Sequence, residues 1–492
     1  MKHRTIAKIP ISPWWGTICV PFSTLWTWGI ASVGLFFGII LSKFDFVLAT
    51  TGITILCLGP LFVLLDKKTV PGLLFGPASI VFLYHAMGYA IGPIAQHYIV
   101  GYFDASIISF ESGFALAQWG CILGLLTFAL VYPVVFNSVS NKMSRYTFSD
   151  KETEMDLAGY GILLVGIAAF IIIFGFLSGA GNRLARLEEV DVLIATIHGS
   201  FQQIHLVMFF FLGFSAARLR GGWIIFWLLI YLAYALFFLL DGSRGVVASA
   251  AIISAMGWAS GGCSQKRVFL VFLVAAFVFI PIAGIVNIYR DAYIGSSESI
   301  VDRLSGMSLA TRDFAGGASV KEFGITDTFF QRVTTHSVDR VFMLTPNEIP
   351  FAGFEGIEDV IFAFVPRVIN PERPVLLDGT ELAIRYGAAP IGLKFGAYMP
   401  AVGDGYRRFG WAGIALLYAL SALLFGALTS LTWRLKARRE WMAMCVFVTL
   451  SASEIMISTL LSSFYTLLWI MPKYFLFFWS MRWIQDRLKF VL

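Results

Sequence analysis

Long apolar stretches recur along most of this chain and constrain its fold more than any other feature. Windows of about 20 residues with little charge have the length that an α-helix needs to cross a bilayer. Only 13% of the 492 residues are charged, against roughly 25% in soluble proteins. The sequence therefore predicts an all-α polytopic membrane protein with about twelve spans. These spans are residues 22–42, 45–65, 71–93, 112–136, 157–178, 200–217, 222–240, 245–261, 268–288, 409–432, 441–462 and 464–482.

The distribution of Lys and Arg supports this count and orients the spans. If the N-terminus is cytoplasmic, the segments facing the cytoplasm hold 19 Lys and Arg residues and the short outward segments hold four. Cytoplasmic loops carry such an excess of positive charge. We therefore expect both ends of the chain in the cytoplasm. The net charge of +6 follows from this bias, and we expect no nucleic-acid partner.

One long polar segment interrupts the apolar pattern and divides the chain into three parts. Residues 1–288 form about nine spans and residues 409–492 about three, by the length that a span needs. Between them, residues 289–408 carry 12 Lys and Arg and 15 Asp and Glu. Apolar residues at helical spacing in 322–344, followed by prolines and glycines, predict an ordered cap of short helices and turns. Topology places this loop outside the cytoplasm.

Neither the cysteines nor the N-terminal sequence points to a covalent framework or a cleaved leader. All five cysteines lie in or beside apolar spans, which predicts packing residues rather than disulfides or metal ligands. Basic residues precede the first span without a small-residue cleavage pattern, so we expect a retained anchor. There is no Walker A loop, no HExxH, no GxSxG and no acidic pair after the first span. We therefore expect neither a metal nor an organic cofactor.

Arg244 is the first candidate functional residue. It lies in the turn Asp241-Gly-Ser-Arg-Gly245, between two spans, on the predicted outer side. Glycines on both sides of Ser243-Arg244 permit a sharp turn and a close approach of the backbone to a ligand. An ionisable residue at a membrane helix end is a candidate for function. The alternative is an interfacial arginine paired with Asp241.

Arginines in the long loop form a second candidate group. Guanidinium groups bind diphosphates bidentately and remain charged in any environment. Several of them together would neutralise a diphosphate leaving group and lower a transfer barrier. For each one, the alternative is an ion pair with a loop acid. The group comprises Arg290, Arg332, Arg340, Arg367, Arg373, Arg407 and Arg408.

His336 is the candidate general base, able to take a proton from an attacking hydroxyl. Arg332, His336 and Arg340 are spaced to share one helical face. The alternative for His336 is a solvated or hydrogen-bonded side chain. Four carboxylates compete for the role of base, and the sequence does not rank them: Glu348, Glu355, Glu381 and Asp404.

The order and placement of these motifs resemble the O-antigen polymerase (Wzy-type) family of oligosaccharide repeat-unit polymerases. The resemblance rests on Ser243-Arg244-Gly245 between spans, on Arg340, on Pro366-Arg367 through Arg373-Pro374, and on Tyr406 through Gly413. It covers roughly residues 240–415 by motif and the whole chain by topology. Two departures are Arg373, where lysine is more usual, and the Arg407-Arg408 pair, where a smaller polar residue is usual.

The resemblance implies a GT-C-like glycosyltransferase of the bacterial inner membrane that works without a cofactor on the periplasmic side. Its substrates would be undecaprenyl-diphosphate-linked oligosaccharides seated among membrane lipids. A chain-length regulator and a flippase would be its partners. Arg244, His336 and Arg367 would be catalytic. The diphosphate or glycan would be bound by Arg290, Arg340, Glu355, Arg373, Asp404, Tyr406, Arg407 and Arg408. We expect Arg244 and residues 364–413 to form two walls of one site.

Two other functions fit the same pattern. An O-antigen ligase, which moves finished glycan onto lipid A core, shares the topology and the use of arginine. A transporter or flippase would place charges and broken helices in the middle of the membrane. Here charge within the spans is sparse, with Glu454 and Lys473 the main exceptions, which favours an enzyme.

Overall fold

The computed structural model describes residues 44–69, 77–100, 108–143, 157–177, 204–219, 221–240, 244–263, 282, 284–286, 288–289, 300–316, 338–357, 382, 384–387, 399–437, 472 and 476. Its elements over these residues are α2 (Phe44–Cys57), α3 (Gly59–Thr69), α4 (Pro77–Ala86), η2 (Met87–Ile91), α5 (Gly92–Ala95), η3 (Gln96–Val100), α6 (Glu111–Met143), α7 (Leu157–Leu177), α9 (Ile204–Leu219), α10 (Gly222–Leu240), α11 (Arg244–Ser260), α13 (Ile300–Ala315), α16 (Val338–Leu344) and α19 (Ala401–Ala437). All of these elements are helical.

Five helical stretches in this part of the chain are long and apolar enough to cross a membrane. They are Val47–Thr69, Pro77–Tyr98, Glu111–Lys142, Gly222–Leu240 and Ala401–Ser430. The described part of the chain is therefore that of an all-α membrane protein. The predicted spans 22–42 and 441–462, most of 268–288 and of 464–482, and much of the loop 289–408 lie outside it.

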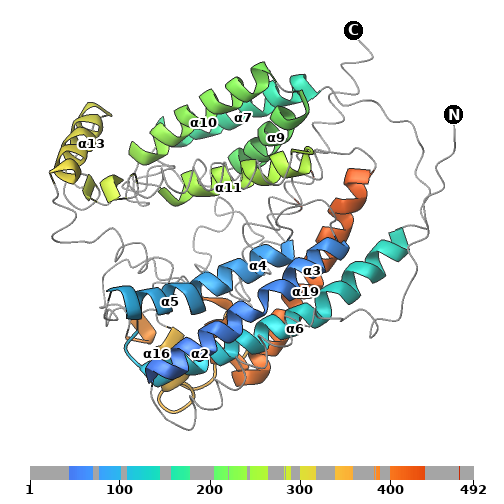
Figure 1. Ribbon diagram of the computed structural model, residues 1–492, viewed down its shortest axis with the longest axis vertical. Helices are drawn as coiled ribbons and strands as arrows, with labels where there is room; N and C mark the ends of the chain where they lie inside the picture. The colour runs from blue at the N-terminus through green and yellow to red at the C-terminus, as the bar shows by residue number, and fades with distance from the viewer. Residues whose placement is uncertain are drawn as a thin grey trace.

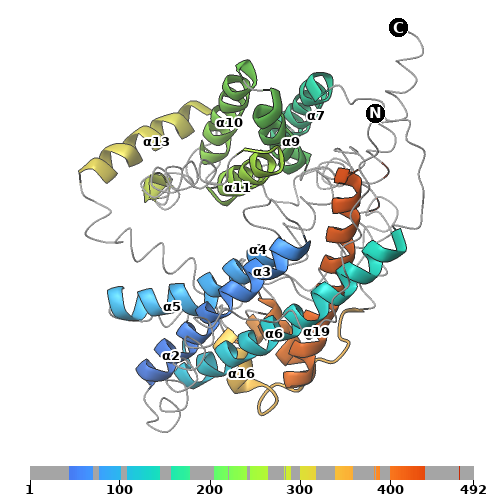
Figure 2. The same cartoon turned by 45° about the vertical axis from the view of Figure 1, so that its right-hand side comes forward.

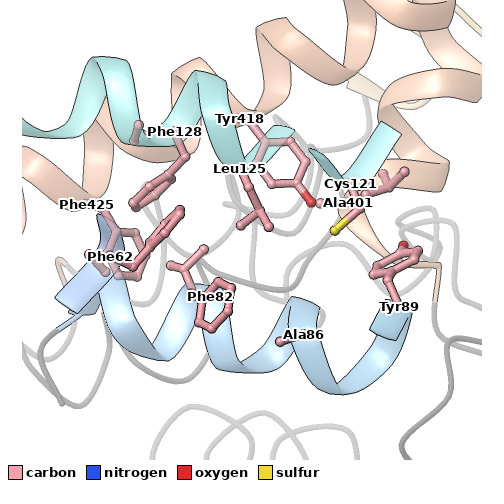
Figure 3. Packing of buried hydrophobic residues seen from close by; sticks show 14 of the residues in the cluster. Phe62, Phe82, Ala86, Tyr89, Cys121, Leu125, Phe128, Ala401, Tyr418 and Phe425 are labelled. Atoms are coloured by element: carbon pink, nitrogen blue, oxygen red, sulfur yellow. The ribbon is translucent and has the colours of Figure 1, made fainter. Parts of the chain in front are cut away.

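The first group of helices contains α2 to α6, α16 and α19 (Figure 1). Its interior is aromatic: Phe62 of α3 lies 5.5 Å from Phe82 of α4 and 6.1 Å from Phe128 of α6, between ring centroids. Phe128 also meets Phe425 of α19, edge to face, at 6.0 Å. Figure 3 shows these rings converging from four helices. Each of these aromatic rings buries a large apolar area where the helices meet.

Glycines bring α6 and α19 into close parallel contact. A Cβ on Gly120 would lie 2.9 Å from Ile414, and one on Gly124 would lie 2.7 Å from the ring of Tyr418. Further along the pair, Gly426 of α19 packs against the backbone of Tyr132. Residue numbers rise together on both helices, so the pair is parallel. Small residues four apart permit this approach between membrane helices.

The second group contains α7, α9, α10, α11 and α13 (Figure 2). Here Gly257 of α11 lies against the backbone of Phe210 and Phe214, and Gly261 lies against Ala217. Helices α9 and α11 are thus also parallel and also meet through glycines four apart. In both pairs the parallel direction is the one that the predicted alternation of spans requires.

Helix α19 begins eight residues earlier than the predicted span, which started at residue 409. The first part, 401–408, is separated from the rest by non-helical backbone at Phe409 and Gly410. The predicted boundary therefore coincides with a kink inside a longer helix. The predicted span started at the kink because the preceding residues, 404–408, are polar and interrupt the apolar run. In the fold, the charged side chains among them are paired and buried.

Candidate functional site

The candidate site is built on the first two turns of α19, residues 401–408. The segment is followed by the kink at Phe409 and Gly410. The φ of Gly410 is +62°, a conformation that only glycine adopts readily. Across the break Gly405 and Gly413 lie in backbone contact, since a Cβ on Gly413 would overlap the Gly405 carbonyl. Glycines at these three positions therefore set the angle at which residues 401–408 leave the membrane helix.

Asp404 holds two arginines in the interior. Its Oδ1 accepts a hydrogen bond from Nε of Arg407 at 2.8 Å, and both its carboxylate oxygens lie 3.2 Å from Nε of Arg408. All three residues are at most 1% exposed. Spacings of three and four residues put both guanidinium groups on the face of Asp404. The pairing avoids an isolated buried charge, which would cost several kcal/mol.

A turn formed by residues 351–357 closes over this segment through backbone hydrogen bonds in both directions. The amides of Ala352 and Gly353 donate to the carbonyls of Arg407 and Arg408, at 2.9 and 3.2 Å. In return Nη1 of Arg408 donates to the carbonyls of Gly353 and Glu355, at 2.9 and 3.0 Å. The kink frees helix carbonyls that need donors, and the turn supplies them.

Glu355 and Arg385 form the accessible edge of the site. Nη1 of Arg385 donates to Oε2 of Glu355 at 2.8 Å, and Nη1 of Arg407 lies 3.9 Å from the same oxygen. The side chains of Glu355 and Arg385 are about one third exposed, at 36% and 33%. The hydrogen bond from Arg385 lowers the pKa of Glu355 below its usual value, so this carboxylate is ionised and weakly basic.

The five residues Glu355, Arg385, Asp404, Arg407 and Arg408, here called the charge cluster, join three segments of the chain. Three guanidinium groups face two carboxylates, which leaves one excess positive charge. Among the described residues, Nη2 of Arg407 and Nη2 of Arg408 have no hydrogen-bond partner. A buried donor without a partner costs about 1–3 kcal/mol, and an anionic oxygen would satisfy it.

Arg385 was not among the residues selected from the sequence. Leu382 and Tyr386, four apart, are each 2% exposed and share a small apolar cluster with Val341 and Met399. This spacing turns Arg385 toward the solvent side of a short helical turn that ends at Gly387. An arginine between two apolar residues at helical spacing was the signal available in the sequence.

Arg340 and its neighbour Asp339 connect α16 to the start of α6. Arg340 donates to the carbonyl of Gly387 and, at 2.6 Å, to the hydroxyl of Ser109. Asp339 accepts from the amides of Ser109 and Phe110 at 2.6 and 2.7 Å, which holds the two residues that precede α6. Burial raises the pKa of Asp339 and these hydrogen bonds oppose that shift. Arg340 thus binds backbone and hydroxyl oxygens beside the charge cluster.

Tyr406 faces the opposite side of the same helical segment. Its ring stacks on Phe342 with centroids 4.0 Å apart and meets Trp411 edge to face at 5.7 Å. It is half-buried. The structure therefore brings six predicted residues into one region: Arg340, Glu355, Asp404, Tyr406, Arg407 and Arg408.

The remaining predicted residues are not joined to this region by described contacts. Arg244 is the first residue of α11, which packs on α9 and α10 in the second helix group. His336, Arg290, Arg332, Arg367 and Arg373 lie outside the described residues, as do Glu381 and the motif Pro366–Pro374. Their roles, and the expectation that Arg244 shares a site with residues 364–413, stay predictions.

Within the described ranges no group of three or more His, Cys, Asp or Glu side chains is arranged to hold a metal ion. The site is thus one of arginines and carboxylates at the start of a membrane helix. No protein-family model, no curated protein and no solved structure matches this chain.

Proposed function

We propose that this chain is a membrane-embedded glycosyltransferase that polymerises undecaprenyl-diphosphate-linked oligosaccharide repeat units. In this proposal it has twelve spans in a GT-C-like arrangement in the bacterial inner membrane. Both termini are cytoplasmic and residues 289–408 are periplasmic. The product is a polysaccharide such as O-antigen or exopolysaccharide.

The observation that carries the proposal is the charge cluster at the start of α19. Three arginines from two segments share two carboxylates, and two of the guanidinium groups keep an unpaired Nη2 among the described residues. The cluster adjoins helices that are long and apolar enough to lie in a bilayer. A substrate with an anionic diphosphate joined to a polyprenyl tail complements both features. The order of motifs around Arg244, Arg367 and Tyr406 also favours it.

The proposed reaction is a displacement at an anomeric carbon. A hydroxyl of the incoming lipid-linked unit attacks the first sugar of the growing chain, its proton passes to a base, and the bond to the diphosphate oxygen breaks. Undecaprenyl diphosphate leaves with the bonding electrons, and the arginines stabilise its added charge. Glu355 is a poor base because its pKa is lowered. In this proposal His336 acts as the base and the arginines bind the diphosphate.

The test is polymer formation by purified protein in liposomes that contain lipid-linked repeat units, without added metal or nucleotide. We expect a ladder of products on a gel. Arg385→Ala removes an accessible guanidinium and should reduce polymer at least about 100-fold, the scale of losing one group that stabilises developing charge. Arg244→Ala and Arg367→Ala should abolish it.

Arg312→Ala is the matched control, because Arg312 is an exposed arginine of α13 outside the cluster. It should leave the ladder unchanged. A wild-type ladder that survives in all three cluster and motif variants would refute the assignment. Transfer only to lipid A core would indicate a ligase, and movement of substrate between leaflets without new glycosidic bonds would indicate a flippase.

A further inference from the structure

Three aromatic side chains beside the charge cluster are exposed to an unusual degree for their size. Phe354 is 67% exposed, Phe351 46% and Trp411 41%. Phe354 meets the half-buried Phe409 at 5.0 Å, and Phe351 and Trp411 both meet the half-buried Tyr406, at 6.4 and 5.7 Å. The two sets adjoin at the kink, because the ring of Phe351 lies 3.4 Å from the Cβ position of Gly410, the residue after Phe409. They form one aromatic surface, contributed by the turn 351–357 and by the two sides of the kink in α19.

This surface lies at the start of the apolar part of α19. Trp411 directly follows the kink, inside the candidate span Ala401–Ser430. Deeper in the same helix Leu416 and Leu423 are 59% and 47% exposed, as expected of side chains that face lipid tails. Trp411 and these leucines are thus all exposed on the part of α19 that follows the kink.

The backbone of the turn is suited to a partly dehydrated layer. The amides of residues 352, 353, 355 and 357 all donate hydrogen bonds within the protein. The carbonyls of residues 352 and 354 accept from amides of the turn, and those of 353 and 355 accept from Arg408. Non-helical backbone near hydrocarbon needs such internal hydrogen-bond partners. A turn that faced only water would not need them, because water would bind its amides and carbonyls.

We propose that Phe351, Phe354 and Trp411 form an aromatic platform that lies in the lipid headgroup layer of the bilayer. Trp and Tyr concentrate at this depth, where an apolar ring and a polar edge both find partners. The occupant of the surface is lipid rather than a protein. The platform fixes the turn 351–357, and through Arg408 it fixes the charge cluster, at the depth of the phosphate groups. This inference rests on the membrane fold and not on the proposed polymerase activity.

The test is photo-crosslinking of the full chain in native membranes. Phe354→p-benzoylphenylalanine and, separately, Phe351→p-benzoylphenylalanine replace one aromatic ring by another and should leave the fold intact. Asn347→p-benzoylphenylalanine is the control, an exposed polar position ahead of the same turn. After irradiation, mass spectrometry of the purified protein identifies each adduct as phospholipid or polypeptide.

We expect phospholipid adducts at positions 354 and 351 at least about fivefold more abundant than at 347, because the apolar side chains of interfacial segments, Phe among them, bury at the boundary of headgroups and acyl chains. Polypeptide adducts at 354 and 351 would show that a protein covers the surface and would overturn the proposal. Equal yields of phospholipid at all three positions, or none at 354 and 351 while the variants remain folded by gel filtration, would overturn it as well.

Discussion

Asp404 is the residue on which the charge cluster depends. It is fully buried and supplies the acceptor oxygens for Nε of both Arg407 and Arg408. A buried carboxylate shared by two guanidinium groups is replaced only at high cost, because its removal leaves like charges facing each other. In the structure it holds both arginines in place through these hydrogen bonds.

Asp404→Asn should therefore destabilise the protein by about 3–5 kcal/mol, the usual cost of breaking a buried ion pair. The measurement is thermal or denaturant unfolding in detergent. Glu348→Gln alters an exposed carboxylate and should change stability by less than about 0.5 kcal/mol. Similar unfolding of both variants would mean that Asp404 does not support the cluster.

The pair of Glu355 and Arg385 predicts a pH dependence. Arg385 lowers the pKa of Glu355 from its ordinary value of 4.5. The stabilising effect is therefore present above pH 4.5 and is lost as pH falls through the lowered pKa. Because the pair is partly exposed, we expect an effect of about 0.5 kcal/mol. Unfolding of wild type and Glu355→Gln at pH 6 and pH 3.5 measures it, and the wild type should lose more stability.

At the level of single residues, the sequence identified most members of the charge cluster but not the hydrogen bonds that join them. Glu355, Asp404, Arg407 and Arg408 stand out as charges near apolar residues. Arg385, which completes the pair with Glu355, follows from its place between Leu382 and Tyr386. That Arg408 binds the carbonyls of residues 353 and 355 was not predictable, because Gly353 is 55 residues away in the chain and the two meet only through the kink that follows Arg408.

Among the elements, the parallel pairs α6–α19 and α9–α11 share one device. Each places glycines four residues apart on the contact face, Gly120 and Gly124 in one pair and Gly257 and Gly261 in the other. Without a hydrophobic force between helices in lipid, close backbone packing is what holds such pairs together. These glycines are structural, and the signal for them was present in the sequence as the spacing GxxxG.

Gly257→Ala should destabilise the α9–α11 pair by about 1–3 kcal/mol, the usual cost of overpacking. The new Cβ would overlap the carbonyl oxygen of Phe210, and a backbone atom cannot move aside as a flexible side chain does. Gly166→Ala in α7 is the control, since nothing lies within 4 Å of that Cβ. Unfolding in detergent compares the two, and equal stability would argue against the described packing.

Helix bounds were predictable where the apolar run and the helix end together, as in α10, whose bounds 222–240 equal the predicted span. Helix bounds were not predictable where a helix continues beyond the apolar run into polar residues. Helix α6 extends to Met143 and α19 begins at Ala401, and the polar first turns of α19 are held by the charge cluster and the turn 351–357. Hydropathy identifies the residues of an apolar segment, whereas the ends of a helix depend on its hydrogen bonds and caps.

For the whole molecule, the relative directions of the helices predict which exposed residues lie on opposite sides of the membrane. The hydrogen bonds from the residues just before α6 to Asp339, and the contacts of α16 with α19, place Asn347 at the end of the bundle where α6 and α19 begin. Lys142 lies at the other end of α6. In the proposed topology the first end is periplasmic.

In a cysteine-free background, Asn347→Cys should react with a membrane-impermeant maleimide in spheroplasts, and Lys142→Cys only after permeabilisation. Both positions are exposed, so access depends on the side of the membrane. Labelling of both in sealed cells, or of Lys142→Cys alone, would contradict the proposed orientation. Gel mobility after labelling gives the result.

The parallel contact of α6 with α19 also has a consequence for how the protein is made. The two helices are separated by about 260 residues, so at 5–20 residues per second the ribosome needs roughly 10 to 50 s to reach α19 after finishing α6. Throughout that interval the glycine face of α6 has no permanent neighbour in the bilayer. A chain that stops before Ala401 would keep this face uncovered, and should be recognised by membrane quality control as unfinished.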